Sequence, residues 1–118
     1  MFKDAGGDWV ALRKLPGLVE VDFHWSDRSS DLSYWEKMGE VYSSAWKALV
    51  QAQQDGNQYV MFRHGASTSR IGKSTARSTV RGLMRSKAAT PYILRSQCIQ
   101  HESVFVAAIR PKAPTSTV

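Results

Sequence analysis

Residues 59–62 constrain the fold more than any other segment, because Tyr-Val-Met-Phe is an apolar run of strand length between polar neighbours. Gln58 precedes the run and Arg63 closes it. A run without polar alternation is typical of a strand that is covered on both faces, as in a βαβ unit. We therefore predict a buried strand over residues 58–63.

The segment before this run has the pattern of a strand followed by a long helix. Apolar and polar residues alternate in residues 18–25, which is the period of a half-buried strand and places Asp22 and His24 on one face. Residues 31–54 have apolar side chains at helical spacing, and Gly56 suits the left-handed conformation that ends a helix. The expected buried face of this helix consists of Trp35, Met38, Tyr42, Ala45, Trp46 and Leu49.

The second half of the chain predicts another helix and two more strands. Residues 75–87 read as a helix with a core stripe, and residues 92–94 and 102–109 read as strands. The core stripe consists of Ala76, Val80, Leu83 and Met84. The order β-α-β-α-β-β predicts an α/β fold, a two-layer sandwich with a four-stranded mixed sheet and two helices.

A single domain is expected over residues 18–110. Residues 1–17 would form an N-terminal arm, in which residues 8–13 could be a short edge strand. The arm's apolar residues Trp9, Val10, Leu12 and Leu15 could dock on the core. Residues 111–118 are expected to be a disordered tail.

Positive charge is concentrated in one part of the chain. The formal net charge is +6, and residues 56–101 contain eight Lys or Arg but no Asp or Glu. A one-sided positive field attracts polyanions and speeds their encounter. We therefore expect a nucleic acid, DNA or RNA, as the partner, in preference to a basic face that serves solubility alone.

The charges recur every four residues at Lys73, Arg77, Arg81 and Arg85. Like charges at this spacing repel by a few tenths of a kcal/mol per pair, roughly, so an anionic partner explains the pattern better than helix stability does. The small polar residues of the preceding loop and the helix start could bind phosphate through backbone N–H groups, although the loop does not match a Walker A motif. The expected nucleic-acid contacts are Arg63, Gly65, Ser67, Arg70, Lys73, Arg77, Arg81 and Arg85.

Histidines and one aspartate are the candidates for chemistry. Asp22 and His24 on one strand face could meet His64 at the end of the next strand. With His101 they include metal-ligand types, but their spacing matches no structural zinc motif, so the sequence defines no metal site. Asp22 and His24 could instead only hydrogen-bond the next loop, and His64 could only cap its turn. His101 and Cys98 are interpreted as structural.

The segments Val21-Asp22-Phe23-His24 and 64–67, His-Gly-Ala-Ser, resemble the LDxH and HGxG motifs of the Smr (small MutS-related) domain. They stand in the same order at the ends of the first two strands, a basic helix follows, and the resemblance covers about residues 19–109. Ser67 replaces the second glycine of HGxG. The resemblance implies nucleic-acid binding and, in some members, metal-assisted nicking of DNA or cleavage of RNA, with Asp22, His24 and His64 as site residues.

Three functional hypotheses follow. The first is a Smr-like domain that binds nucleic acid through its basic loop and helix and needs no cofactor for binding. The second is a structure-selective endonuclease that uses Asp22, His24 and His64 with a divalent metal. The third is an interaction module for an acidic protein partner. No apolar run is long enough to span a membrane, and a lone Cys98 without a signal peptide predicts a cytoplasmic location.

Overall fold

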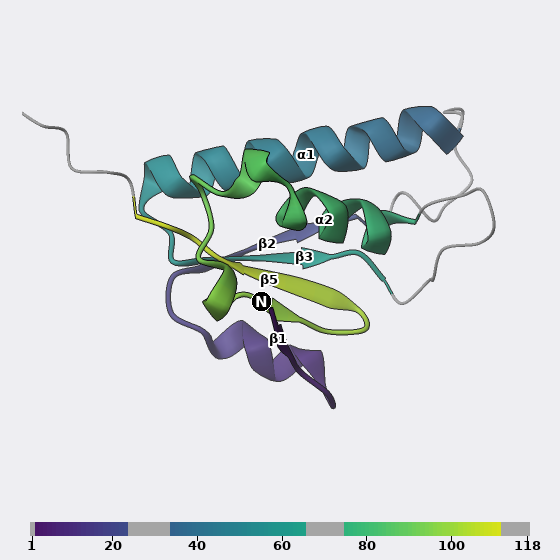
Figure 1. The fold of residues 1–118 in the computed structure, drawn as a ribbon. Coiled ribbons are helices and arrows are strands. Elements are labelled where there is room, and N and C mark those ends of the chain that lie inside the picture. Colours follow the sequence, from purple (N-terminus) through teal and green to yellow (C-terminus); the bar gives the residue numbers. More distant parts are fainter. Residues whose placement is uncertain (1, 24–33, 66–74, 112–118) are drawn as a thin grey trace, which may run out of the picture.

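The computed structural model describes residues 2–23, 34–65 and 75–111, and these form a mixed sheet with two α-helices on one face (Figure 1). The sheet has five strands in the order β1-β4-β5-β3-β2. None of the described helices is long and apolar enough to cross a membrane. The strands are β1 (Lys3–Asp4), β2 (Leu18–Asp22), β3 (Tyr59–Arg63), β4 (Ile99–Gln100) and β5 (Val104–Ala108).

Strand β3 is the buried strand that its apolar run predicts. It pairs in parallel with β2 on one side and antiparallel with β5 on the other. Val60, Met61 and Phe62 are fully buried. Val60 and Phe62 belong to the main core under the helices, whereas Met61 belongs to a smaller core with Val104 and Val106. Both faces of β3 are therefore covered, as predicted.

Helix α1 (Tyr34–Asp55) connects the parallel strands β2 and β3, as in a βαβ unit. Gly56 ends it with φ +76°, and the Asn57 N–H donates to the Ala52 carbonyl at 2.9 Å, which is a Schellman closure. Among the α1 side chains that the structure describes, which do not include the predicted core residue Trp35, the buried ones are Val41, Ala45, Leu49 and Ala52. The prediction that Tyr42 is buried was wrong: it is 44% exposed, because the face that meets the sheet is centred one residue earlier, on Val41.

Helix α2 (Ala76–Arg85) buries the stripe that the sequence predicts, namely Ala76, Val80, Leu83 and Met84. Thr75 and Ser78 form a reciprocal capping box at its start: the Thr75 hydroxyl accepts from the Ser78 N–H, and the Ser78 hydroxyl accepts from the Thr75 N–H. The helix ends at Arg85, and residues Lys87–Ala89 form a short 3-10 helix instead of a last α-helical turn.

The sheet differs from the predicted one in its short strands. Residues 92–94 do not form a strand: only an isolated bridge joins Ile93 to Ile109. Instead, β4 follows a 3-10 turn at Arg95–Gln97 and pairs antiparallel with β5. Strand β1 pairs in parallel with β4 and is the fifth strand of the sheet. Both β1 and β4 have two residues, which is too short for a period-2 pattern to be visible.

The N-terminal arm covers the sheet face opposite the helices (Figure 1). The prediction of an edge strand at residues 8–13 was wrong, because Trp9–Lys14 is a 3-10 helix, η1. The Asp8 carboxylate caps it by accepting from the Val10 N–H at 3.0 Å. Trp9, Leu12 and Leu15 pack on the smaller core, as expected of a docked arm, while Val10 is 43% exposed.

Candidate nucleic-acid interface

The candidate site lies at the end of the sheet where the parallel strands β2 and β3 finish. In open α/β sheets ligands bind outside the carboxyl ends of the strands. The Phe23 N–H donates to the Arg63 carbonyl at 2.9 Å, so the backbone segments of β2 and β3 stay paired just beyond Asp22. Gly65 has φ +83°, and its N–H donates to the Ser103 carbonyl at 3.1 Å. In the sequence this His64–Gly65 turn precedes α2.

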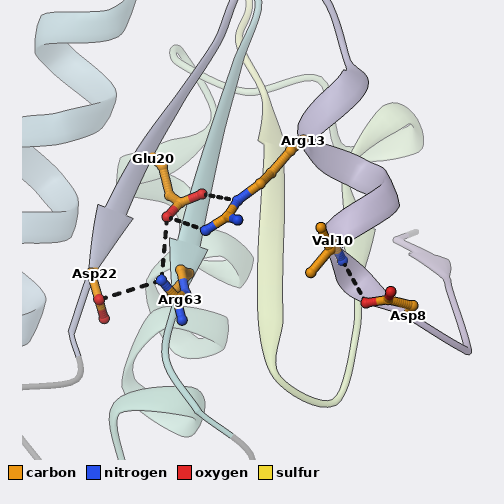
Figure 2. A network of polar contacts seen from close by, with 6 residues as sticks. All are labelled: Asp8, Val10, Arg13, Glu20, Asp22 and Arg63. Carbon is orange, nitrogen blue, oxygen red and sulfur yellow. Dashed lines mark hydrogen bonds and ion pairs between the residues drawn. The ribbon is translucent and has the colours of Figure 1, made fainter.

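Asp22 and Arg63 face the side of the sheet that η1 covers. They are register partners, and the Arg63 Nη1 lies 3.6 Å from Asp22 Oδ2 and 3.5 Å from Glu20 Oε2 (Figure 2). Arg13 of η1 holds the same Glu20 with a bidentate pair of hydrogen bonds at 2.8 and 3.1 Å. The hydrogen bonds from Arg13, followed by its charge and that of Arg63, lower the pKa of Glu20.

The ring of Trp9 lies against both arginines of this group of charged side chains. The guanidinium carbon of Arg13 lies 4.8 Å from the centre of the Trp9 ring, and that of Arg63 lies 4.7 Å from it. Each contact is a cation–π interaction, in which the ring face attracts the positive charge. Arg63 is thus positioned by a carboxylate pair and an aromatic ring, and its charge is largely balanced within the protein.

His64 is buried on the helix side and is 2% exposed. Its Nδ1 lies 2.6 Å from the Gly65 carbonyl, so Nδ1 carries the proton that is donated there. Burial lowers its pKa from the ordinary 6.5 to about 4; the charges of Arg81 and Arg77 add to this effect, and the backbone of Gly65 and Val104 opposes it. His64 is therefore neutral at pH 7 and supplies no positive charge.

The arginines of α2 differ in their surroundings. The Arg81 Nη2 donates to the His101 carbonyl at 3.1 Å, which ties α2 to the β4–β5 turn. Burial lowers the Arg81 pKa, the charges of Arg77 and Arg85 lower it further, and the charge of Asp4 opposes them. Arg77 is half-buried, and Arg85 is exposed. The helix itself contains no acidic residue.

His101 has the structural role that the sequence suggests. Its Nε2 lies 2.7 Å from the Gly7 carbonyl, and its Nδ1 accepts from the Ser103 N–H at 3.0 Å. The imidazole therefore joins the N-terminal arm to the β4–β5 turn, while the His101 carbonyl receives Arg81. Cys98 is fully buried, and burial raises the pKa of its thiol, so it too is part of the core.

The structure brings only some of the predicted site residues together. Gly65, Arg77 and Arg81 lie near His64, whereas Asp22 faces the other side of the sheet with Arg63. Within residues 2–23, 34–65 and 75–111, no group of three His, Cys, Asp or Glu side chains could hold a metal ion. Four predicted site residues lie outside the described residues: His24, Ser67, Arg70 and Lys73.

Sequence reasoning missed the roles of Trp9, Arg13 and Glu20. The one available signal was the alternation in residues 18–25, which places Glu20 on the same strand face as Asp22. Trp9 and Arg13 lie in an arm without a regular pattern, so only the packing of η1 reveals their contact with Arg63.

A comparison with family models, curated proteins and solved structures finds no match to this chain. The resemblance to the Smr domain therefore rests on the two short motifs alone and stays a prediction.

Proposed function

We propose that this domain binds nucleic acid, with phosphates held along α2 and beside the His64–Gly65 turn. The observation that carries the proposal is the positive field of α2. Arg77 and Arg85 each lower the pKa of Arg81, which means that the helix concentrates like charges. The charge of Asp4 in β1 opposes this effect at Arg81, but residues 56–101 themselves contain no Asp or Glu. A phosphate backbone relieves this repulsion.

The side chains around the His64–Gly65 turn have different roles in the proposed binding. Arg85 is exposed and forms no ion pair with any residue in the described part of the chain, so it can move to meet a phosphate. Arg81 is held by the His101 carbonyl, so it is less free than Arg85 to meet a phosphate. Neutral His64 cannot contribute a charge, but it keeps the turn in place through its Gly65 contact.

The salt dependence of binding tests this proposal. Each phosphate contact contributes a slope of roughly −0.7 to log K against log salt concentration for a single strand. Arg85→Gln should weaken binding and reduce the slope by about one such contact. Lys47→Gln is the matched control, because it removes one exposed positive charge from α1, outside the basic segment. Binding that does not depend on salt, or equal slopes in all three proteins, contradicts the proposal.

The endonuclease and protein-docking hypotheses predict other results. A nuclease that uses Asp22, His24 and His64 with a divalent metal would lose nicking activity in His24→Ala and His64→Ala. Equal activity in these variants and the wild type would indicate a contaminant. Docking of an acidic protein on the same helix would appear as a pull-down that survives nuclease treatment. No contact among the described residues favours either hypothesis over nucleic-acid binding.

A further inference from the structure

Strand β2 is the last strand on one side of the sheet, and its outer edge is open. The order β1-β4-β5-β3-β2 leaves β2 paired with β3 alone among the described strands. The strand at the opposite edge, β1, has two residues, whereas β2 has five. Proteins protect a long edge strand with lysine, proline or a bulge, because its unpaired N–H and C=O groups can bind another strand. Strand β2 contains no lysine or proline, and its register with β3 is unbroken.

Two hydrogen bonds establish which main-chain groups of β2 face outwards. The Gly17 carbonyl accepts from the first N–H of β3 at 3.3 Å, and the Phe23 N–H donates to the last carbonyl of β3 at 2.9 Å. The main-chain groups of these two residues therefore point towards β3. Because this direction alternates along a strand, the N–H and carbonyl groups of Leu18 and Glu20 point away from β3.

The exposure of Glu20 shows that this edge is not covered. Glu20 as a whole residue is exposed, yet its side chain, which Arg13 and Arg63 hold, is only 27% exposed. Its main chain must therefore be more exposed than its side chain. Among the described residues, none forms a backbone hydrogen bond with the outward groups of Leu18 or Glu20. These groups are available to a further strand.

The side chains of β2 suit pairing with a second copy of the same strand. In an antiparallel pair with a two-fold axis at Val19, Leu18 of one copy lies opposite Glu20 of the other. Their outward N–H and carbonyl groups exchange two hydrogen bonds, and the symmetric pair exchanges two more. Val19 and Val21 are half-buried against the main core. The two Val19 side chains meet at the axis, where the facing side chains of a strand pair pack closely.

The charges of β2 agree with this register. Each Glu20 carboxylate lies beside a leucine of the other copy, so no like charges are opposite each other. An axis at Glu20 would place two carboxylates opposite each other, which destabilises a strand pair. In the register centred on Val19, the Glu20 side chain keeps its contacts with Arg13 and Arg63, because the new hydrogen bonds use only main-chain groups.

We propose that this domain forms a two-fold dimer in which the β2 strands of two copies pair antiparallel around Val19. The two sheets become one continuous sheet, and the axis is perpendicular to it. Both α-helices of each copy cover the same face of its sheet (Figure 1), so the dimer presents both copies of α2 on one side. The inference does not depend on nucleic-acid binding, because the pairing uses β2 alone.

Sedimentation equilibrium of nuclease-treated protein over a concentration series tests the proposal. One chain has a mass of 13.2 kDa, and the wild type should approach twice this mass as its concentration rises. Glu20→Pro removes the outward N–H at a position where an edge strand tolerates proline. Glu20→Ala is the matched control, because it loses the same carboxylate and keeps the N–H. Glu20→Pro should dimerise about tenfold or more weakly than Glu20→Ala, since one hydrogen bond is lost from each copy.

Single cysteines test the register, and they decide the question if Glu20→Pro fails to fold, as judged by circular dichroism. In Val19→Cys the two new thiols meet at the axis and should form an intermolecular disulfide under mild oxidation. Val21→Cys is the matched control on the same strand face, and its two thiols would be roughly 13 Å apart along the strands. It should not form the disulfide. Cys98 is buried and should give no cross-link in the wild type.

The outcomes separate this dimer from the proposed function. A wild type that stays monomeric at every concentration overturns the dimer and leaves the β2 edge to a strand of another protein. Equal cross-linking of Val19→Cys and Val21→Cys overturns it, and so does equal dimerisation of folded Glu20→Pro and Glu20→Ala. Salt-dependent binding of nucleic acid is measured separately, and its failure would leave the dimer intact.

Discussion

The buried imidazole of His64 should make the stability of this protein depend on pH in a defined window. The folded protein holds the His64 pKa at about 4, whereas an unfolded chain returns it to 6.5. Protonation therefore favours the unfolded state. The contribution of the neutral imidazole is complete above pH 6.5 and is lost as the pH falls towards 4.

The size of this effect follows from the two pKa values. One pKa unit corresponds to about 1.4 kcal/mol, and at about pH 5 the unfolded histidine is almost fully protonated while the folded one is not. The free energy of unfolding should fall by about 2 kcal/mol between about pH 7.5 and pH 5 because of His64. The shift of the Glu20 pKa acts at lower pH, since it lies below the ordinary value of 4.5.

Urea denaturation at several pH values measures this dependence. His64→Gln is the comparison, because glutamine is polar and does not titrate; it is expected to be less stable at neutral pH and to depend less on pH between 7.5 and 5. The difference between the two slopes isolates His64 from the other titrating groups. Parallel pH profiles of the wild type and His64→Gln would refute the assignment of the effect to this imidazole.

Two predictions concern the ends of α2. Thr75→Ala removes one half of the capping box with Ser78 and should lower the free energy of unfolding by about 1 kcal/mol in urea denaturation, whereas an unchanged midpoint would mean that the cap adds nothing. Arg95→Ala removes the guanidinium that donates to the Met84 and Ser86 carbonyls and should cost about 1–3 kcal/mol in the same assay. Arg95→Lys should recover only part of this loss, because lysine lacks the planar fork that reaches both carbonyls; full recovery would contradict the bidentate role.

The sequence predicts well those elements whose burial produces a local pattern of apolar residues. Strand β3 is apolar at each of its three central positions because the helices cover one face and η1 covers the other. The buried stripe of α2 follows from helical spacing alone, and Gly56 ends α1 because glycine adopts positive φ without strain.

The elements that the sequence misses depend on contacts between distant segments. Strand β1 exists because Lys3 pairs with Ile99, and neither residue stands in a recognisable strand pattern. The segment at 92–94 has the composition of a strand, but only Ile93 forms a β-bridge, with Ile109. The chain then enters a 3-10 turn at Arg95. A local pattern cannot distinguish a bridge from a ladder.

The candidate site shows the same division between local pattern and packing. The alternation of β2 places Asp22 on its polar face, but the residue that joins it across the sheet depends on the register between β2 and β3. That register pairs Asp22 with Arg63, so His64 projects to the helix side. A shift of one residue would have exchanged Arg63 and His64, because successive side chains of a strand point to opposite faces.

If the domain binds nucleic acid as proposed, a count of the positive charges in the sequence overstates the number of phosphate contacts. Arg63 is balanced by Glu20 and Asp22 and stacked on Trp9, and Arg81 is partly buried against the His101 carbonyl. Neither can give up its protein partners for a phosphate without loss, whereas exposed Arg85 can. Because counterion release counts only the charges that phosphates neutralise, the salt slope should correspond to fewer contacts than the eight Lys and Arg of residues 56–101. A slope that matched all eight would mean that nucleic acid displaces the internal partners of Arg63 and Arg81.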